Sequence, residues 1–336
     1  MGRFGRYLLT KVAWFLVAFA LALVFNFLLI RLIPGNPVDT MVARMASGGA
    51  TGEAQQKIYQ AYITEFGMDK PLWQQFFIYV GNLAHGDLGN SFAQYPTPVM
   101  QLITQALPWT IALQLPAILI GWIVGNVLGV FVAYRQGWLD KTVFPAALFI
   151  SNMPFYCLSI LLLYLFAVVL RILPAVGGYD FSMSPHLSGD FIGSAAQHYI
   201  LPFLSLVLVF IGGQAIGMRA MSIYELDADY VRYSRSLGVR DNRIVRYIFR
   251  NAMLPQVTGL ALSIGGLVSG ALITEIVFSY PGIGTLLFAS IRQEDYATVQ
   301  GITLFIMIAV LTANFLVEIA YGFIDPRIRA TQTGDR

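Results

Sequence analysis

Long apolar runs, separated by polar segments, give this sequence its pattern. Six of the runs are long enough to cross the roughly 30 Å hydrocarbon core of a bilayer as α-helices. They are 10–33, 105–133, 144–173, 199–218, 256–278 and 298–323. The runs are continuous and do not alternate with a period of two, which favours helices over barrel strands. The pattern therefore predicts an all-α membrane protein with six transmembrane helices.

The composition supports a membrane setting and argues against several other classes. Of the 336 residues, 57% are hydrophobic and only 12% are charged, whereas about a quarter of the residues in a soluble domain are charged. A net charge of +3 gives no reason to expect a nucleic-acid partner. The single cysteine, Cys157, and the scattered His85, His186 and His198 predict neither a disulfide nor a metal site.

The placement of basic residues predicts the orientation. The loop 219–254 holds seven arginines, whereas the loops on the other side of the flanking runs hold one Arg, Arg292, and no Lys. Because basic residues concentrate on the cytoplasmic side, both termini, 1–9 and 324–336, are expected in the cytoplasm. The first run exceeds the length of a signal-peptide core and is read as a retained span. The extracytoplasmic segments are then 34–104, 174–198 and 279–297.

The cytoplasmic loop 219–254 has the pattern of two short helices. Asp227 is expected to cap the first helix, and Gly238 is expected to end it in the left-handed conformation. At 100° per residue, one face of this helix carries Tyr230, Tyr233, Ser234 and Leu237.

The second helix of this loop begins near Arg240 and is amphipathic. Its basic stripe is Arg240, Arg243, Arg246 and Arg250, and its apolar side is Ile244, Val245, Ile248, Phe249 and Ala252. Pro255 is expected to open the fifth span, where a missing N–H costs least. Two interpretations of the helix pair are open. The helices either lie on anionic lipid or form a knob that docks in a groove of a cytoplasmic partner.

Several motifs resemble those of one family, and they occur in the order that the family shows. They are R-L-I-P-G-N-P at 31–37, F-G-M-D-K-P-L-W-Q-Q-F at 66–76, H-G-D-L-G-N-S at 85–91, D-Y-V-R-Y-S-R-S-L-G at 229–238, R-N-A-M-L-P at 250–255, T-E-I-V-F-S-Y-P-G-I-G at 274–284 and D-P-R-I-R at 325–329. Together they resemble the binding-protein-dependent ABC permeases of the dipeptide/oligopeptide/nickel family, whose EAA-type loop corresponds to 229–238 and 250–255.

The resemblance implies a type I ABC importer permease fold in a prokaryotic cell membrane. It implies that the chain pairs with a second homologous permease, above two cytoplasmic ATPase subunits and below an extracytoplasmic solute-binding protein. It also implies that a helix at 228–238 couples to the ATPases, through Asp229, Tyr230, Arg232, Tyr233, Ser234, Arg235, Leu237 and Gly238. Of these, Tyr233, Ser234 and Leu237 depart from the family's small-residue and lysine pattern, as does Ser236.

The chain has no phosphate-binding loop of its own. The glycine-rich stretch 48–53 lacks the lysine of G-x-x-x-x-G-K-[ST] and falls in a predicted extracytoplasmic segment. ATP and Mg²⁺ are therefore expected in the partner ATPases, and this chain is expected to be a transport subunit without a cofactor rather than an enzyme.

Candidates for the translocation pathway come from small and polar residues at membrane depth. Glu275 is expected to shape the outer gate. An ionisable group buried unpaired in a span is costly, so its presence there marks a candidate functional position. The small residues of the fifth run fit close helix packing as well as a pathway wall. The full set of candidates is Ser263, Gly266, Ser269, Gly270, Glu275 and Phe278.

The long outer segment 34–104 is expected to have structure of its own. One helix is expected to end at Gly67, and Trp73, Phe76, Phe77 and Tyr79 follow it. This aromatic part fits an interfacial cap over the mouth and fits contact with the binding protein equally well.

Other functions compete with the importer interpretation. A secondary transporter working without ATPases would leave the arginine-rich loop unexplained, and a membrane hydrolase lacks a nucleophile–base signature. For the importer, di- or oligopeptides are the first expectation for cargo, with oligosaccharides or nickel as alternatives.

Overall fold

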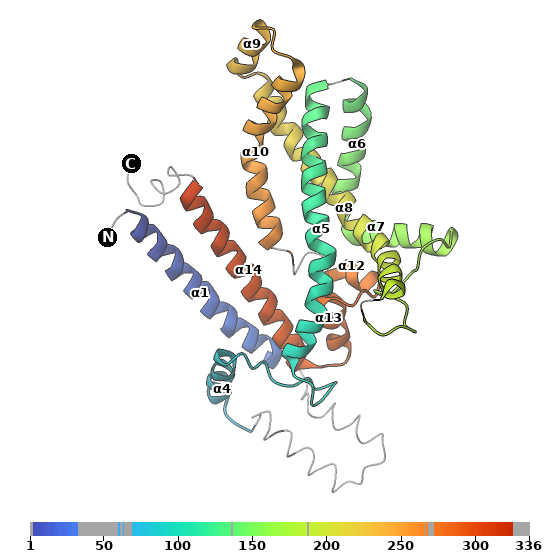
Figure 1. Ribbon diagram of the computed structural model, residues 1–336. Helices are drawn as coiled ribbons and strands as arrows, with labels where there is room; N and C mark the ends of the chain where they lie inside the picture. The colour runs from blue at the N-terminus through green and yellow to red at the C-terminus, as the bar shows by residue number, and fades with distance from the viewer. Residues whose placement is uncertain are drawn as a thin grey trace. The chain divides into compact units, whose positions relative to one another are not determined.

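The computed structural model describes residues 3–32, 60, 63, 69–135, 137–186, 188–265, 267 and 272–324. Their regular structure is helical, apart from one bridge between Asn90 and Pro98. The elements are α1 (Arg3–Leu32), α4 (Leu72–Ala84), α5 (Val99–Arg135), α6 (Trp138–Asn152), α7 (Phe155–Leu162), the π-helical η1 (Leu163–Val169), α8 (Gly189–Leu226), α9 (Asp229–Ser236), α10 (Asp241–Gly265), α12 (Leu272–Val277), α13 (Ile283–Arg292) and α14 (Tyr296–Ile324) (Figure 1). The all-α prediction is confirmed for these residues.

Among the described helices, four are long and apolar enough to cross a membrane by themselves. They are α1, α5, α8 and α14, and the bent pair of α6 with α7 and η1 would make a fifth. The structure therefore supports four or five spans by length and composition. The remaining predicted run, the fifth at 256–278, falls on the end of α10 and on α12, and the residues between them include positions outside the described set.

The third predicted run is not one helix. α6 and α7 meet at an angle of 102° at Met153 and Pro154. Pro154 supplies no N–H for a helical bond, and it favours an extended conformation in the residue before it. Met153 has φ −79° and ψ 124°, in agreement with that effect. The single helix predicted over 144–173 is therefore wrong.

The helix start predicted at Pro255 is also wrong. α10 begins at Asp241, close to the start predicted for the second loop helix, and continues past Pro255 to Gly265. An internal proline leaves one carbonyl of the preceding turn without its helical partner. The loop helix and the beginning of the fifth predicted run therefore form one continuous element.

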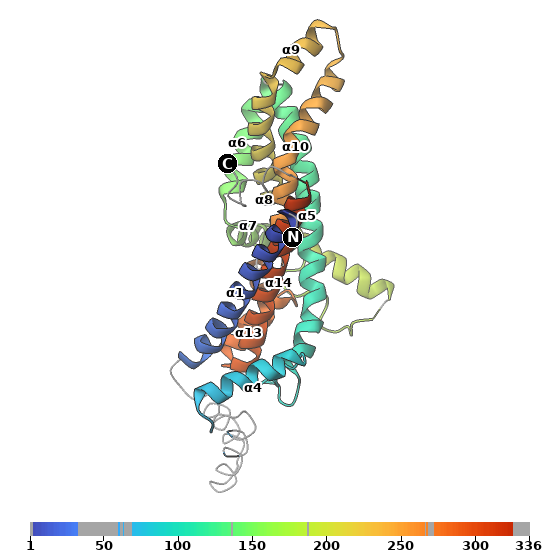
Figure 2. The same cartoon turned by 90° about the vertical axis from the view of Figure 1, so that its left-hand side faces the viewer.

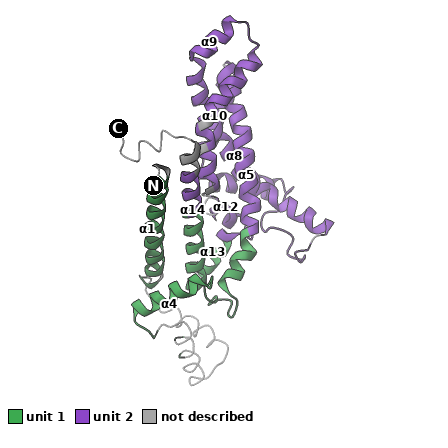
Figure 3. Ribbon diagram, turned by 60° about the vertical axis from the view of Figure 1, so that its left-hand side comes forward, with its two compact units in different colours: residues 1–107, 285–311, 325–336 green, residues 108–284, 312–324 purple. Residues whose placement is uncertain are grey.

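The chain divides into two compact units (Figure 3). Unit 1 comprises 1–107, 285–311 and 325–336, and unit 2 comprises 108–284 and 312–324. Unit 2 holds an apolar core in which Leu113, Leu206 and Phe278 are buried. A second cluster, around Met218, Val231 and Ile248, joins the end of α8 to α9 and α10.

A stripe of glycines lets α5 and α8 pack closely within unit 2. Gly121, Gly125 and Gly129 follow one another at intervals of four residues and face α8. A Cβ on Gly125 would lie 2.6 Å from Gln214 Cβ, and a Cβ on Gly129 would lie 2.5 Å from Ala215 O. Small residues at this spacing bring helix backbones together in membranes. The stripe was not among the residues predicted from the sequence.

Within unit 1, Asn26 joins α1 to α4 and to the first half of α14. Its Nδ2 donates to Tyr79 Oη and to the Gln300 carbonyl, both at 3.1 Å, and its Oδ1 accepts from Thr303 Oγ1 at 2.7 Å. Asn26 is fully buried, so these bonds offset the cost of placing an amide in an apolar setting.

Asp295 gives unit 1 a second polar junction. The carboxylate is buried and accepts from the Ser91 hydroxyl, from the Phe92 N–H at 2.9 Å and from Thr298 Oγ1 at 2.7 Å. The junction fixes the segment before α5 to the start of α14.

Candidate functional site

The predicted coupling segment forms the short helix α9. Figures 1 and 2 show it at the tip of unit 2, beyond the ends of α8 and α10. Its N-cap is Ala228, and no side chain caps it. The cap predicted at Asp227 is wrong because Asp227 ends α8 instead, with φ −89° and ψ −3°.

The end of α9 follows the sequence prediction. Gly238 has φ +70°, its N–H donates to Arg235 O at 3.0 Å, and the Val239 N–H donates to Ser234 O at 3.1 Å. These two bonds form a Schellman motif, which satisfies the last carbonyls of a helix and requires a left-handed residue. The left-handed conformation predicted for Gly238 is confirmed.

Packing fixes one side of α9. Val231 is fully buried against Met218 of α8 and against Ile244 and Ile248 of α10. The apolar side predicted for the second loop helix is therefore confirmed at Ile244, Val245, Ile248 and Ala252, which are buried.

Tyr230 braces the same side by a hydrogen bond. Its hydroxyl donates to Glu225 Oε2 at 2.7 Å, and Asn251 Nδ2 lies 3.5 Å from the same oxygen. Burial, together with this bond to Glu225, raises the pKa of Tyr230 to about 12. The phenol thus stays neutral and keeps its donor at any physiological pH.

The opposite side of α9 is open. Tyr233 and Leu237 are 66% and 62% exposed, and Arg232 and Arg235 are exposed beside them. The face predicted from the sequence is therefore divided: Tyr230 packs inward, whereas Tyr233 and Leu237 project outward. Exposed aromatic and aliphatic side chains flanked by arginine are typical of protein interfaces.

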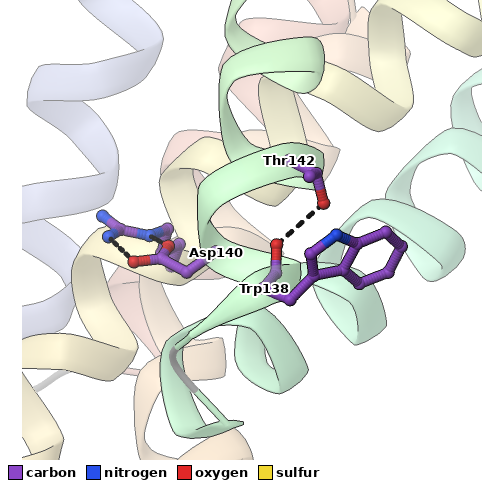
Figure 4. Close-up of polar contacts among 4 residues, drawn as sticks. Trp138, Asp140 and Thr142 are labelled. Atoms are coloured by element: carbon purple, nitrogen blue, oxygen red, sulfur yellow. Dashed lines mark hydrogen bonds and ion pairs between the residues drawn. The ribbon is translucent and has the colours of Figure 1, made fainter.

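An ion pair supports the adjoining part of α8. Arg219 Nε and Nη2 donate to the two carboxylate oxygens of Asp140 on α6, at 2.7 and 3.0 Å (Figure 4). The guanidinium also lies 4.1 Å from the centre of the Phe144 ring. A two-point arginine–carboxylate contact fixes orientation as well as distance.

Glu275 occupies a second candidate site, and it is fully buried. Thr110 Oγ1 of α5 donates to its Oε1 at 2.7 Å, and the Gly284 N–H donates to its Oε2 at 2.6 Å. Thr110 Oγ1 in turn accepts from the Ile283 N–H at 2.9 Å. Since Ile283 and Gly284 are the first two residues of α13, the two side chains cap N–H groups that have no partner within that helix.

The glycines of the 274–284 motif are explained by this cap. A Cβ on Gly282 would overlap the Glu275 carboxylate, and one on Gly284 would lie 2.6 Å from Leu272 Cα. Phe278 and Tyr280 are buried in the core of unit 2, and the Gly177 N–H donates to Phe278 O at 2.7 Å. Glu275 and Phe278 thus lie inside the chain rather than on an open wall.

Of the other predicted pathway residues, the structure describes only Ser263. Ser263 donates to Gly259 O of its own helix at 2.9 Å. Gly266, Ser269 and Gly270 lie outside the described residues. Thr110 was missed by the sequence analysis, because nothing near it in the sequence signals a partner 165 residues away.

Comparison with known proteins gives the family. Residues 125–330 match the family described as binding-protein-dependent transport system inner membrane component. The chain is 34% identical over 321 residues to the probable D,D-dipeptide transport system permease protein DdpB of Escherichia coli, covering 91% of this chain and 92% of that protein.

Two further relatives are similar over nearly the whole chain. The di/tripeptide transport system permease protein DppB of Pseudomonas aeruginosa is 35% identical over 319 residues, or 90% of this chain and 93% of that protein. The glutathione transport system permease protein GsiC of Pectobacterium atrosepticum is 31% identical over 327 residues, or 96% and 98%. The chain thus belongs to the family of binding-protein-dependent transport system inner membrane components.

Proposed function

We propose that this chain is one permease half of an ATP-driven importer of di- or oligopeptides. It pairs with a second, homologous permease, and a solute-binding protein delivers the cargo from outside. The names of the relatives support peptide as the cargo, because two of the three are peptide permeases and the third is a glutathione permease. The charge distribution supports six spans with both termini in the cytoplasm.

The observation that carries the proposal is the two-sided character of α9. Val231 and Tyr230 brace the helix against α8 and α10, whereas Tyr233 and Leu237 are exposed. A partner that holds the exposed side can therefore move the braced side without bending it. We infer that two ATPase subunits supply this partner surface, one for each permease half.

The mechanism that follows is rigid-body transmission. When the ATPases close around nucleotide, α9 is displaced, and the packed ends of α8 and α10 move with it. The continuity of α10 through Pro255 favours this mechanism, since displacement at Asp241 reaches Gly265 within one helix. Asp229, Arg232, Ser234 and Arg235 are the polar members of the proposed docking surface.

At the 274–284 motif we propose a positioning role. Glu275 and Thr110 set the start of α13 and hold the loop that contains Phe278 against the core. The buried residues do not contact cargo in this arrangement. Ser263, Gly266, Ser269 and Gly270 stay candidates for the pathway wall.

Reconstitution tests the proposal. The chain, its second permease, the two ATPases and the binding protein are placed in proteoliposomes, and ATP-dependent uptake of labelled dipeptide, tripeptide, oligosaccharide and nickel is compared. We expect peptide uptake that requires both ATP and the binding protein. Uptake by the chain without ATPases contradicts the importer mechanism, and uptake of only sugar or nickel contradicts the cargo.

A further inference from the structure

α4 has an unusual composition for a helix outside the candidate spans. Its sequence from Leu72 to Ala84 is L-W-Q-Q-F-F-I-Y-V-G-N-L-A, without a single charged residue. It includes one tryptophan, two phenylalanines and one tyrosine. In water, a helix of this kind would expose apolar side chains, which is unfavourable. Its two faces differ in what covers them.

One face of α4 is fastened to the end of α1. The Phe76 ring lies edge-on to Phe27 with centroids 5.3 Å apart, and Tyr79 accepts from Asn26 Nδ2 at 3.1 Å. Gln75 Oε1 accepts from Arg31 Nη2 at 3.1 Å. These contacts lie within unit 1 and fix both the height and the rotation of α4 along α1.

The other face of α4 is mostly apolar, with the half-buried Gln74 as its polar member, and it is exposed among the described residues. Trp73 and Phe77 are four residues apart, share one side of the helix and are 62% and 67% exposed. Leu72 and Ile78 are also exposed. The fastened side carries Gln75 and Tyr79, whose hydrogen bonds to Arg31 and Asn26 hold the helix in this rotation.

The depth of α4 follows from its attachment. The apolar span of α1 covers Tyr7–Leu29, and Arg31 lies just beyond it, with its guanidinium 3.8 Å from the centre of the Phe27 ring. Figures 2 and 3 show α4 lying across this end of α1 instead of extending along its axis. A helix held at the end of a span and turned across it lies at the level of the lipid headgroups.

We propose that α4 is an interfacial helix, and that its Trp73 and Phe77 face is embedded between the headgroups and acyl chains of the adjoining leaflet. Tryptophan and other aromatic residues are enriched at this level of a bilayer, and helices with one apolar face lie in the interface plane. The lack of charge on α4 favours lipid over the binding protein, because a transient protein contact would be expected to include charged rim residues.

Site-directed spin labelling of the assembled transporter tests this assignment. In a Cys157→Ala background, a label is attached at Trp73→Cys, at Phe77→Cys or, as the matched control, at Asn82→Cys on the opposite side of α4. The complex is placed in nanodiscs of phosphatidylethanolamine and phosphatidylglycerol. Collision rates are then measured with oxygen, which concentrates in lipid, and with a nickel chelate, which stays in water.

We expect the ratio of oxygen to nickel collisions to be severalfold higher at positions 73 and 77 than at position 82. This ratio should not change when the binding protein is added. Water-accessible labels that become protected on adding the binding protein would instead assign the face to that protein. Labels protected from both reagents in the assembled complex would assign it to the second permease, and a ratio equal to that at position 82 would also overturn the proposal.

A second measurement keeps the test independent of labelling. Brominated lipid quenches tryptophan emission only at contact. The unlabelled complex should therefore lose a larger share of its emission than the complex with Trp73→Phe, and equal quenching of the two would contradict the proposal.

Discussion

α9 and the Glu275 site use their motif residues in opposite ways. At α9, a few residues brace the helix, whereas Tyr233 and Leu237 project from it. Around Glu275, most of the motif residues are buried within unit 2, and the glycines make room for the carboxylate. A motif can thus mark a surface that needs a partner or a junction that is complete within the chain. Burial and hydrogen bonding distinguish the two.

The largest effect on stability is expected from Glu275→Leu. The change removes the acceptor of the Thr110 hydroxyl and of the Gly284 N–H, which remain buried. Two unsatisfied donors should lower the free energy of unfolding by about 4 kcal/mol, measured by denaturant titration in detergent micelles. Thr110→Ser, which keeps the hydroxyl, is the control and should stay close to the wild type. A stable Glu275→Leu protein would show that the junction is not complete within the chain.

The next largest effect on stability is expected from Gly282→Ala. Its methyl group would overlap the Glu275 carboxylate, and overpacking of a fixed site costs about 2 kcal/mol. Gly213→Ala on α8 is the matched control, because a Cβ there meets nothing within 4 Å. Thermal unfolding of both variants measures the difference, and equal melting temperatures would argue against a rigid cap.

A smaller effect is expected at the end of α9. Gly238→Ala meets no neighbour, so its cost is only that of the left-handed backbone, about 1 kcal/mol. Hydrogen exchange of the Gly238 and Val239 amides should therefore accelerate severalfold, while the rest of the chain is unchanged. Gly238→Asn should exchange more slowly than Gly238→Ala, because asparagine tolerates this conformation better.

The smallest effect on stability should accompany a large effect on transport. Tyr233→Ala and Leu237→Ala remove exposed side chains and should change the free energy of unfolding by less than about 0.5 kcal/mol. If α9 docks on the ATPases, uptake by the reconstituted transporter should fall while the basal ATPase activity is retained. Val231→Ala, on the buried side of α9, should show the opposite pattern, in which the main effect is a lower free energy of unfolding.

Local patterns in the sequence predicted the parts of the structure that depend on neighbouring residues. The apolar side of α10 and the left-handed Gly238 follow from helical periodicity and from the conformational freedom of glycine. The bend at Pro154 also has a local cause, but the apolar run around it concealed the break. Asp227 shows the limit of such patterns. The residue could end α8 or cap the start of α9, and the sequence alone does not decide between these two positions.

The contacts between distant residues could not be predicted in this way. Thr110 and Glu275 are 165 residues apart, and Arg219 and Asp140 are 79 residues apart. Each of these side chains has several possible partners in a chain of this length. The packing of the helices in the folded chain brings these particular pairs together, Thr110 of α5 with Glu275 of α12 and Arg219 of α8 with Asp140 of α6.

The junction at Asp295 has a consequence for biogenesis. Ser91 and Asp295 are separated by 204 residues, so the ribosome delivers Ser91 long before its partner exists. The segment that leads into α5 cannot form this junction until Asp295 has been synthesised. In a nascent chain that stalls before Asp295, the Ser91 hydroxyl and the Phe92 N–H lack the carboxylate that accepts from them in the folded chain.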